Sequence, residues 1–253
     1  MRAYELLKET FWRRRYIWIV HVVWLALYVM FWWLYYPDPE EFGGLLFLCG
    51  GFLLPLALSA GIIGDDVASG RICVVLTRPL RPGTLFAYRL LGLSLQGAIH
   101  FLLAGIVILV LRLVTRKGST EDLALWLFLS WLLFNTWAAL STSSSVLVKR
   151  SQNSLFLLVA FITIGGVLQI LIWNLRNYAV GDVLKGILRY GFPPHTLLRD
   201  LGNGEFEEKN LVLAGLHLPR TLVYTAHSLL LTMIYAVPGV LIFRKKQFLA
   251  ERD

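Results

Sequence analysis

The sequence carries little charge. Only 16% of its 253 residues are charged, while 57% are hydrophobic, whereas an ordinary soluble domain has about 25% charged residues. A soluble domain of this length could not bury so many apolar residues in its core. The composition therefore excludes an ordinary soluble domain.

Charge is absent altogether from six long stretches. Each is long enough to cross the roughly 30 Å hydrocarbon layer of a membrane as a helix. The stretches are Ile17–Tyr36, Phe42–Gly64, Leu90–Leu111, Leu123–Val148, Ser154–Leu175 and Thr221–Phe243. A continuous apolar run satisfies its backbone polar groups only within a helix. The sequence therefore predicts an all-α integral membrane protein, with six transmembrane helices in a single domain that covers residues 1–253.

Basic residues are unevenly divided among the segments between these stretches. With the N-terminus inside, the cytoplasmic segments hold 15 of the 24 Lys and Arg residues but only 6 of the 16 Asp and Glu residues. This bias predicts that both termini are cytoplasmic. The net charge of +8 then reflects topology and contact with anionic lipid headgroups, and it does not indicate nucleic-acid binding.

Two segments outside the spans show helical periodicity. Residues 1–15 combine an apolar face with basic residues, which predicts an amphipathic interfacial helix, with a simple basic anchor as the alternative. Residues 176–220 form the one long external connection. Apolar residues recur there at helical spacing, at Val180, Val183, Leu184, Ile187 and Leu188. A structured external segment is therefore expected between the fifth and sixth spans.

Motifs for catalysis and metal binding are missing. The chain has no phosphate-binding loop, no His-Glu-x-x-His and no Cys-x-x-Cys pair. Its two cysteines, Cys49 and Cys73, have no metal-ligand spacing. Ser59 lacks the first glycine of a nucleophile elbow, and we interpret it as a helix-packing serine. The sequence therefore predicts that the chain is not an enzyme and binds no metal or cofactor itself.

Polar residues within the spans are few, and none is acidic. They are His21, Gln96, His100, Asn135, Gln169 and His227. Such residues either hydrogen-bond a neighbouring helix or line a pathway, and the sequence leaves both readings open. Ion-driven transporters usually hold an ionisable group at mid-membrane. A transporter without a carboxylate there is expected to take its energy from a partner.

The segment between the second and third spans has an unusual pattern. Residues 64–83 read GDDVASGRICVVLTRPLRPG, and the topology places them in the cytoplasm. Asp66 is followed by Gly70 four residues later, Pro79 follows after nine more, and Arg89 after a further ten. Topology explains the arginines, but it does not require this spacing of acid, glycine and proline.

This spacing resembles the signature of the ATP-binding-cassette type 2 (ABC-2) exporter permeases, which is Glu-x-x-x-Gly, a proline nine residues later and a basic residue ten after that. Asp66 stands in place of the usual Glu and Arg89 in place of the usual Lys. Arg81 lies one position before the family's common basic residue, where this chain has Pro82. The order of segments agrees along the whole chain, which looks most similar to the permeases of nitrous-oxide-reductase maturation.

The resemblance implies a permease subunit of an ATP-driven exporter in the cytoplasmic (inner) membrane of a prokaryote. In that family two permease copies, identical or related, form the pathway, and two cytosolic ATPase subunits bind ATP and Mg beneath them. Residues 65–89 would be the coupling loop, a short helix begun by its aspartates and an exit stiffened by prolines. The coupling residues are Asp65, Asp66, Gly70, Arg71, Ile72, Val75, Arg78, Pro79, Arg81 and Arg89.

The pathway itself is expected between subunits, with the second and fifth spans as its lining. The candidate lining residues are Ser59, Gly165, Gly166 and Gln169. The expected partners are the ATPase, a second permease copy and membrane lipids. Nothing in these residues selects a substrate.

Two other functions stay open. One is a non-transporting subunit that anchors or assembles a larger complex. The other is an intramembrane enzyme that uses His21, His100 and His227. For residues 65–89 the alternative is a loop whose basic residues only set the orientation in the membrane and which binds no partner.

Overall fold

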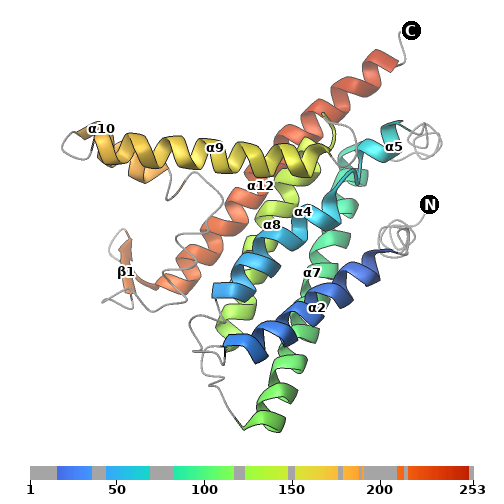
Figure 1. Ribbon diagram of the computed structural model, residues 1–253. Helices are drawn as coiled ribbons and strands as arrows, with labels where there is room; N and C mark the ends of the chain where they lie inside the picture. Colours follow the sequence, from blue (N-terminus) through green and yellow to red (C-terminus); the bar gives the residue numbers. More distant parts are fainter. Residues whose placement is uncertain are drawn as a thin grey trace.

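The computed structural model describes residues 16–35, 44–68, 82–116, 123–147, 152–175, 179–187, 190, 210–213 and 216–250. Its helices are α2 (Tyr16–Tyr35), the π-helical η1 (Leu46–Leu53), α4 (Leu54–Ser59), α5 (Gly64–Ala68), α7 (Pro82–Thr115), α8 (Leu123–Ser144), α9 (Gln152–Asn174), α10 (Ala179–Gly186) and α12 (Arg220–Ala250). An antiparallel hairpin of β1 (Asn210–Leu213) and β2 (Leu216–Pro219) leads into α12. Figure 1 shows the arrangement.

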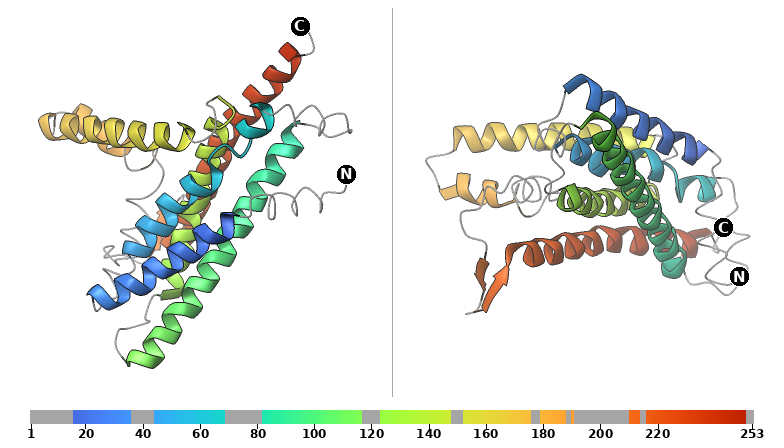
Figure 2. Two further views of the ribbon diagram at one scale, coloured as in Figure 1. Left: turned by 45° about the vertical axis from the view of Figure 1, so that its right-hand side comes forward. Right: turned by 90° about the horizontal axis from the view of Figure 1, so that it is seen from below.

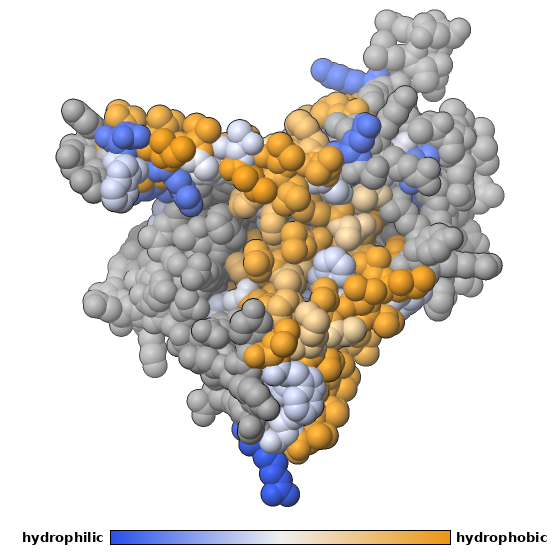
Figure 3. All heavy atoms as spheres, in the orientation of Figure 1, coloured by the Kyte–Doolittle hydropathy of each residue, from blue (hydrophilic) through white to orange (hydrophobic). Residues whose placement is uncertain are grey.

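Six helical segments among these residues are long and apolar enough to span a membrane. They are Ile17–Leu34, Leu46–Asp66, Gly83–Thr115, Leu123–Ser144, Gln152–Asn174 and Thr221–Lys245. The predicted all-α membrane fold is confirmed, and the chain has the pattern of a multi-pass membrane protein. Figure 3 shows apolar residues over the middle of the described surface and hydrophilic ones at its tips. The predicted interfacial helix of residues 1–15 lies outside the described residues.

Helix α8 is the centre of the bundle. Helices η1, α4, α7 and α12 pack around it, as Figures 1 and 2 show. Residues 132–139 of α8 are buried without interruption. The neighbouring helices therefore enclose this part of the fourth span on every side.

Small and hydroxyl-bearing residues bring α12 against α8. Ser143 Oγ donates a hydrogen bond to the Tyr235 carbonyl oxygen at 2.6 Å, and the hydroxyl oxygens of Thr136 and Thr232 lie 3.2 Å apart. Gly239 permits this approach, because a Cβ there would stand 2.8 Å from the Cα of Ser143. The serine-rich end of the fourth span therefore bonds across to a neighbouring helix.

The second span, predicted over Phe42–Gly64, is broken near its C-terminal end. After α4, Ala60 has a ψ of 116° and Gly61 a φ of 64°, and the Ile62 N–H donates to the Ser59 carbonyl at 3.1 Å. These are the features of a type II β-turn, whose third residue needs a positive φ and is therefore usually glycine. The chain then restarts as α5, so Gly61 separates the main part of the span from its end.

The third span begins earlier than predicted. Helix α7 starts at Pro82 and has 34 residues, which makes it about 51 Å long at roughly 1.5 Å per residue. Proline suits the first helical position, because it has a fixed φ and lacks an N–H that would be unpaired there. The interval 82–89, expected as part of a loop, is therefore helical, and Arg89 projects from a helix.

Helix α9 leaves the bundle from its N-terminal end. Figures 1 and 2 show it extending away from α7, α8 and α12. Its buried residues are Asn153 and Leu157, and Phe161 packs against the rings of Phe52 and Trp137. Most of its other apolar side chains are exposed. The fifth span is thus anchored at its base and offers the remaining surface to lipid or to another chain.

The predicted external segment is structured where it is described. Helix α10 forms at the expected place and packs beside α9, and the hairpin precedes α12. The apolar side chains of Val180 and Val183 are exposed on α10, and that of Ile187 is exposed directly after it. Leu188 and residues 191–209 lie outside the described part of the chain.

Candidate functional site

The described part of the coupling segment contains a buried ion pair. Nη2 of Arg89 on α7 lies 3.1 Å from Oδ2 of Asp66 on α5. Both side chains are almost completely enclosed, with exposed fractions of 2% and 5%. The two charged residues at the ends of the sequence signature, 23 positions apart, are therefore in direct contact.

Local helix geometry places the two partners. Asp66 lies in the first turn of α5, where the partial positive charge of a helix N-terminus favours a carboxylate. Arg89 lies in the second turn of α7, and its guanidinium cannot lose its charge in a protein. Its burial therefore requires a counter-ion, and Asp66 supplies it.

Because the ion pair is buried, it stabilises the contact between α5 and α7. Removing one partner of a buried pair leaves an uncompensated charge and costs about 3–5 kcal/mol, whereas an exposed pair contributes about 0–1 kcal/mol. The chain contains an exposed pair for comparison: Lys185 Nζ lies 3.3 Å from Asp182 Oδ1 on α10, with exposed fractions of 53% and 76%. Of these two pairs, Asp66–Arg89 is the one that joins separate helices and is shielded from water.

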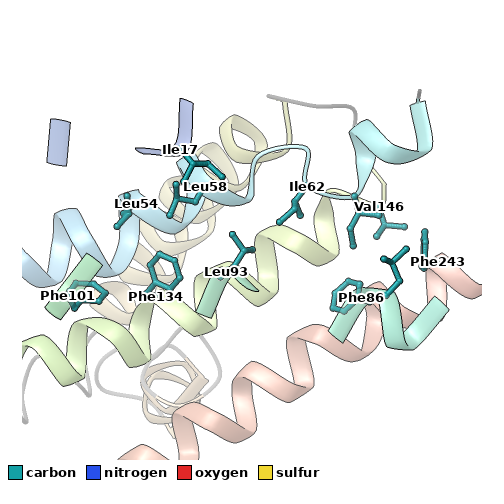
Figure 4. Close-up of a cluster of buried hydrophobic side chains, with 13 residues drawn as sticks. Ile17, Leu54, Leu58, Ile62, Phe86, Leu93, Phe101, Phe134, Val146 and Phe243 are labelled. Carbon is teal, nitrogen blue, oxygen red and sulfur yellow. The ribbon is translucent and has the colours of Figure 1, made fainter. Parts of the chain in front are cut away.

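Apolar side chains surround the break before α5. One buried cluster combines residues of the break, of α7, of the end of α8 and of α12, namely Ile62, Ile63, Leu85, Phe86, Val146 and Phe243. Figure 4 shows Phe86, Val146 and Phe243 gathered at this end of the cluster, with Ile62 beside them. The break is thereby packed together with the ends of three other spans.

A fully buried asparagine closes the break from the other side. Oδ1 of Asn153, in the first turn of α9, accepts the Gly61 N–H at 3.3 Å. Nδ2 of Asn153 donates to the carbonyl and the hydroxyl oxygens of Ser141 at 3.2 and 3.3 Å. Next to it, Ser154 Oγ donates to the Leu56 carbonyl at 2.6 Å. The base of α9 is thereby bonded to both the second and the fourth spans.

Several predicted coupling residues fall outside the described part of the chain. These are Gly70, Arg71, Ile72, Val75, Arg78, Pro79 and Arg81. Asp65 is half-buried in α5, which confirms the short helix begun by the two aspartates. Of the predicted set, the structure thus places Asp65, Asp66 and Arg89, and it brings the last two together.

A second polar cluster lies between α2 and α7. The Nδ1 atoms of His21 and His100 are 3.1 Å apart, and the Tyr28 hydroxyl lies 3.2 Å from Nε2 of His100. All three side chains are buried. Gly50 of η1 makes room for them, because a Cβ there would stand 2.6 Å from the Tyr28 oxygen. Two of the histidines expected either to pack or to function are therefore bonded to each other.

The remaining polar residues of the spans are separated. Asn135 donates to the Trp131 carbonyl within α8, Gln96 is buried on α7, and the His227 ring meets the Tyr190 ring edge-on. They form no common polar site with one another among the described residues. Packing accounts for these contacts.

The predicted lining residues are not brought together either. Ser59 is buried, and its hydroxyl donates to the Pro55 carbonyl in its own helix, as a packing serine does. Gly165, Gly166 and Gln169 lie on the part of α9 that has left the bundle, and a Cβ at either glycine would meet nothing within 4 Å. Among the described residues of one copy, Ser59 and the three α9 residues do not come together, so their role stays a prediction about an assembly.

Sequence reasoning missed two residues of these clusters. Asn153 follows a basic turn and looks like an ordinary loop-end residue, while Tyr28 is one aromatic residue among many in the first span. A usable signal was the position of Asn153 in the first helical turn of an otherwise apolar span, since an amide there has few partners in lipid. Nothing in the sequence indicated that its partner is Gly61, 92 residues away.

Across the described ranges, no three His, Cys, Asp or Glu side chains gather as metal ligands. A scan against protein-family models finds no match, and a search of the curated proteins finds none. Function must therefore be argued from the geometry and from the sequence spacing.

Proposed function

We propose that the chain is the permease subunit of an ATP-driven exporter, coupled through residues 65–89 to a separate ATPase subunit. The single observation that carries the proposal is the buried contact between Asp66 and Arg89. These residues stand at the two ends of the spacing that resembles the ABC-2 signature. The positive-inside bias accounts for basic residues that face water in cytoplasmic segments. It does not explain why Arg89 is buried against Asp66.

The pair suits a coupling role because it joins the two ends of the loop. Residues 69–81 lie between α5 and α7, and the ion pair ties α5 to α7 at the base of that segment. A displacement of the loop by a bound ATPase would then act on both the second and third spans together. An unpaired loop would absorb the same displacement in its own backbone.

The distribution of charge supports an external source of energy. The charged residues of the described spans lie near the span ends, at Asp65, Asp66, Arg89, Arg112, Arg116, Arg244 and Lys245. The middle of these spans is free of carboxylates, which proton- and sodium-driven transporters usually need. ATP and Mg would be bound by the partner ATPase. The proposed setting is a prokaryotic inner membrane with both termini cytoplasmic, as the positive-inside bias indicates.

The free surface of α9 supports a second permease copy. The helix is apolar, and only its base packs on the bundle. In this proposal another copy, identical or related, covers part of that surface, and the transport pathway lies between the copies. Gly165, Gly166 and Gln169 would then reach the pathway from α9.

The same surface also favours a second candidate function. A helix that projects from its own bundle is suited to anchoring another membrane protein, so a non-transporting assembly subunit remains the alternative. The two functions differ in their partner. Only the exporter requires a cytosolic ATPase.

The discriminating experiment is purification of the intact chain from native membranes in mild detergent, with identification of bound proteins and measurement of vanadate-sensitive ATP hydrolysis. The exporter predicts a copurified phosphate-loop ATPase whose activity depends on the permease. Repeated recovery of the chain without an ATPase would contradict the exporter and favour the assembly subunit.

Charge variants test whether the ion pair carries the coupling. Exchange of the two charges, Asp66→Arg with Arg89→Asp, should restore ATPase stimulation that either single change abolishes. The matched control is the exposed pair on α10, where Asp182→Asn should leave stimulation unchanged. Equal stimulation in the wild type and in both single variants would contradict coupling through this contact.

A further inference from the structure

The turn at Gly61 joins the coupling element to the rest of the permease. Its N–H is bonded to Asn153 Oδ1 of α9, while its carbonyl oxygen accepts the Asp65 N–H of α5 at 2.9 Å. The next residue of α5, Asp66, holds Arg89 of α7. One residue, Gly61, therefore lies between the base of the fifth span and the helix that carries the ion pair.

The amide of Asn153 suits this position because it is both a hydrogen-bond acceptor and a hydrogen-bond donor. Its oxygen accepts from the Gly61 N–H, and its nitrogen donates to Ser141 at the end of α8. A hydrophobic residue of similar size would leave the buried Gly61 N–H without this acceptor, at a cost. It would also remove the link between Asn153 and Ser141, whose carbonyl oxygen still accepts the Ser145 N–H and the Ser144 hydroxyl. The side chain is completely buried, so water does not replace either partner.

The turn has the properties of a hinge. Its type II geometry depends on the positive φ of Gly61, and the break interrupts the helical hydrogen bonds between α4 and α5. Hinges are positions at element ends where a few residues absorb a change in backbone angles. Asn153 is the side chain that bonds this hinge to a different span.

We propose that Asn153 is a positioning residue that latches the Gly61 hinge and so links movement of α5 to the base of α9. The inference rests on the proposed function, because it takes α5 as the end of the coupling loop. With the latch closed, α5, α8 and the base of α9 keep one relative position. When the Gly61 N–H leaves Asn153, α5 can turn with the ion-paired end of α7 while α4 stays packed against α8.

The first test is hydrogen exchange, read by mass spectrometry, on the full chain in lipid nanodiscs. In Asn153→Leu, amides 61–66 should exchange about tenfold faster or more than in the wild type, because a local opening no longer breaks the Asn153 bonds. Amides of α8 near Phe134 should keep their rates. Unchanged exchange at 61–66 would overturn the proposal.

Two further variants keep the test specific. Asn174→Leu removes the same amide from the exposed end of α9, where Nδ2 bonds only to the Ile170 carbonyl of its own helix, and it should leave exchange at 61–66 unchanged. Ser141→Ala removes one acceptor of Asn153 Nδ2 and leaves the Gly61 contact in place, so its increase should be smaller than that of Asn153→Leu. An equal increase in Ser141→Ala and Asn153→Leu would show that the Gly61 contact is not the latch and would overturn the inference.

The second test uses the complex with the copurified ATPase. Exchange at 61–66 in the wild type should differ between the nucleotide-free and ADP-vanadate states, and Asn153→Leu should remove most of that difference while the ATPase still copurifies. A wild-type hinge that is insensitive to nucleotide would contradict the linking role. Absence of any ATPase refutes the exporter instead, and the nanodisc measurement then decides by itself whether Asn153 latches the hinge.

Discussion

His21 and His100 face each other through their Nδ1 atoms at 3.1 Å, across the contact between α2 and α7. One ring must donate and the other accept, so the two tautomers are coupled. The Tyr28 hydroxyl, 3.2 Å from Nε2 of His100, extends the coupling to a third side chain. The three uncharged side chains thereby hydrogen-bond one another inside an apolar bundle.

Replacing both histidines should cost less than the sum of the two single replacements. His21→Leu leaves the buried Nδ1 of His100 without its partner, at about 1–3 kcal/mol. In the double variant that group is gone, and the Tyr28 hydroxyl alone loses its partner. A double-mutant cycle of His21→Leu and His100→Leu, followed by thermal unfolding in detergent, should show a loss in the double variant well below the sum of the single losses. Simple additivity would indicate that the two rings do not interact.

The Asp66–Arg89 pair should dominate the electrostatic contribution to folding. Asp66→Asn should lower the free energy of unfolding by about 3–5 kcal/mol, because Arg89 stays charged and buried. The double variant Asp66→Glu with Arg89→Lys should retain most of the stability. It carries the two residue types that are usual in the ABC-2 signature. Unfolding by denaturing detergent measures both, and Asp182→Asn on α10 should change it by less than about 1 kcal/mol.

Gly239 should tolerate no side chain. A Cβ there would meet Ser143 Oγ at 2.5 Å, Phe86 Cε2 at 2.7 Å and Ser143 Cα at 2.8 Å, so Gly239→Ala must separate α12 from α8 and should destabilise the fold by about 1–3 kcal/mol. Gly166→Ala on α9, where the space is open, is the matched control. Its helix should become slightly more stable, because alanine favours a helix interior over glycine. Similar melting temperatures for the two variants would contradict this packing.

The backbone of Gly61 gives a separate prediction. With a φ of 64°, Gly61→Ala should destabilise the chain by about 1–2 kcal/mol through the left-handed conformation alone. Gly61→Asn should lose less, because asparagine adopts that conformation more readily. Thermal unfolding of the two variants side by side tests the turn, and an alanine variant at least as stable as the asparagine variant would argue against it.

Sequence patterns predicted the fold closely where the pattern is local. The six spans were found from their lack of charge, and the short helix begun by Asp65 and Asp66 from the preference of carboxylates for a helix start. The same reasoning placed α7 too late, because Arg89 was taken as the end of the loop. A charged residue often marks the end of an apolar run, but a helix can continue past it, and in this chain α7 begins seven residues before Arg89.

The candidate site was predictable only in part. Spacing singled out Asp66 and Arg89 as functional residues, yet it did not say that they touch. For Asn153 the sequence offered a polar residue beside a turn and no indication of Gly61 as its partner. Ser59 was correctly interpreted as a packing serine, because its hydroxyl needs only a carbonyl one turn away.

The sequence by itself determined that this protein is a bundle of membrane helices, since long charge-free runs satisfy their backbone groups in no other way in lipid. Helical periodicity fixes which residues share a face of one helix, but it does not choose the helix opposite. Tertiary packing made that choice, pairing Asp66 with Arg89, His21 with His100 and Asn153 with the backbone of Gly61. Each pairing exists because a polar group buried by the fold had to find its partner on another helix.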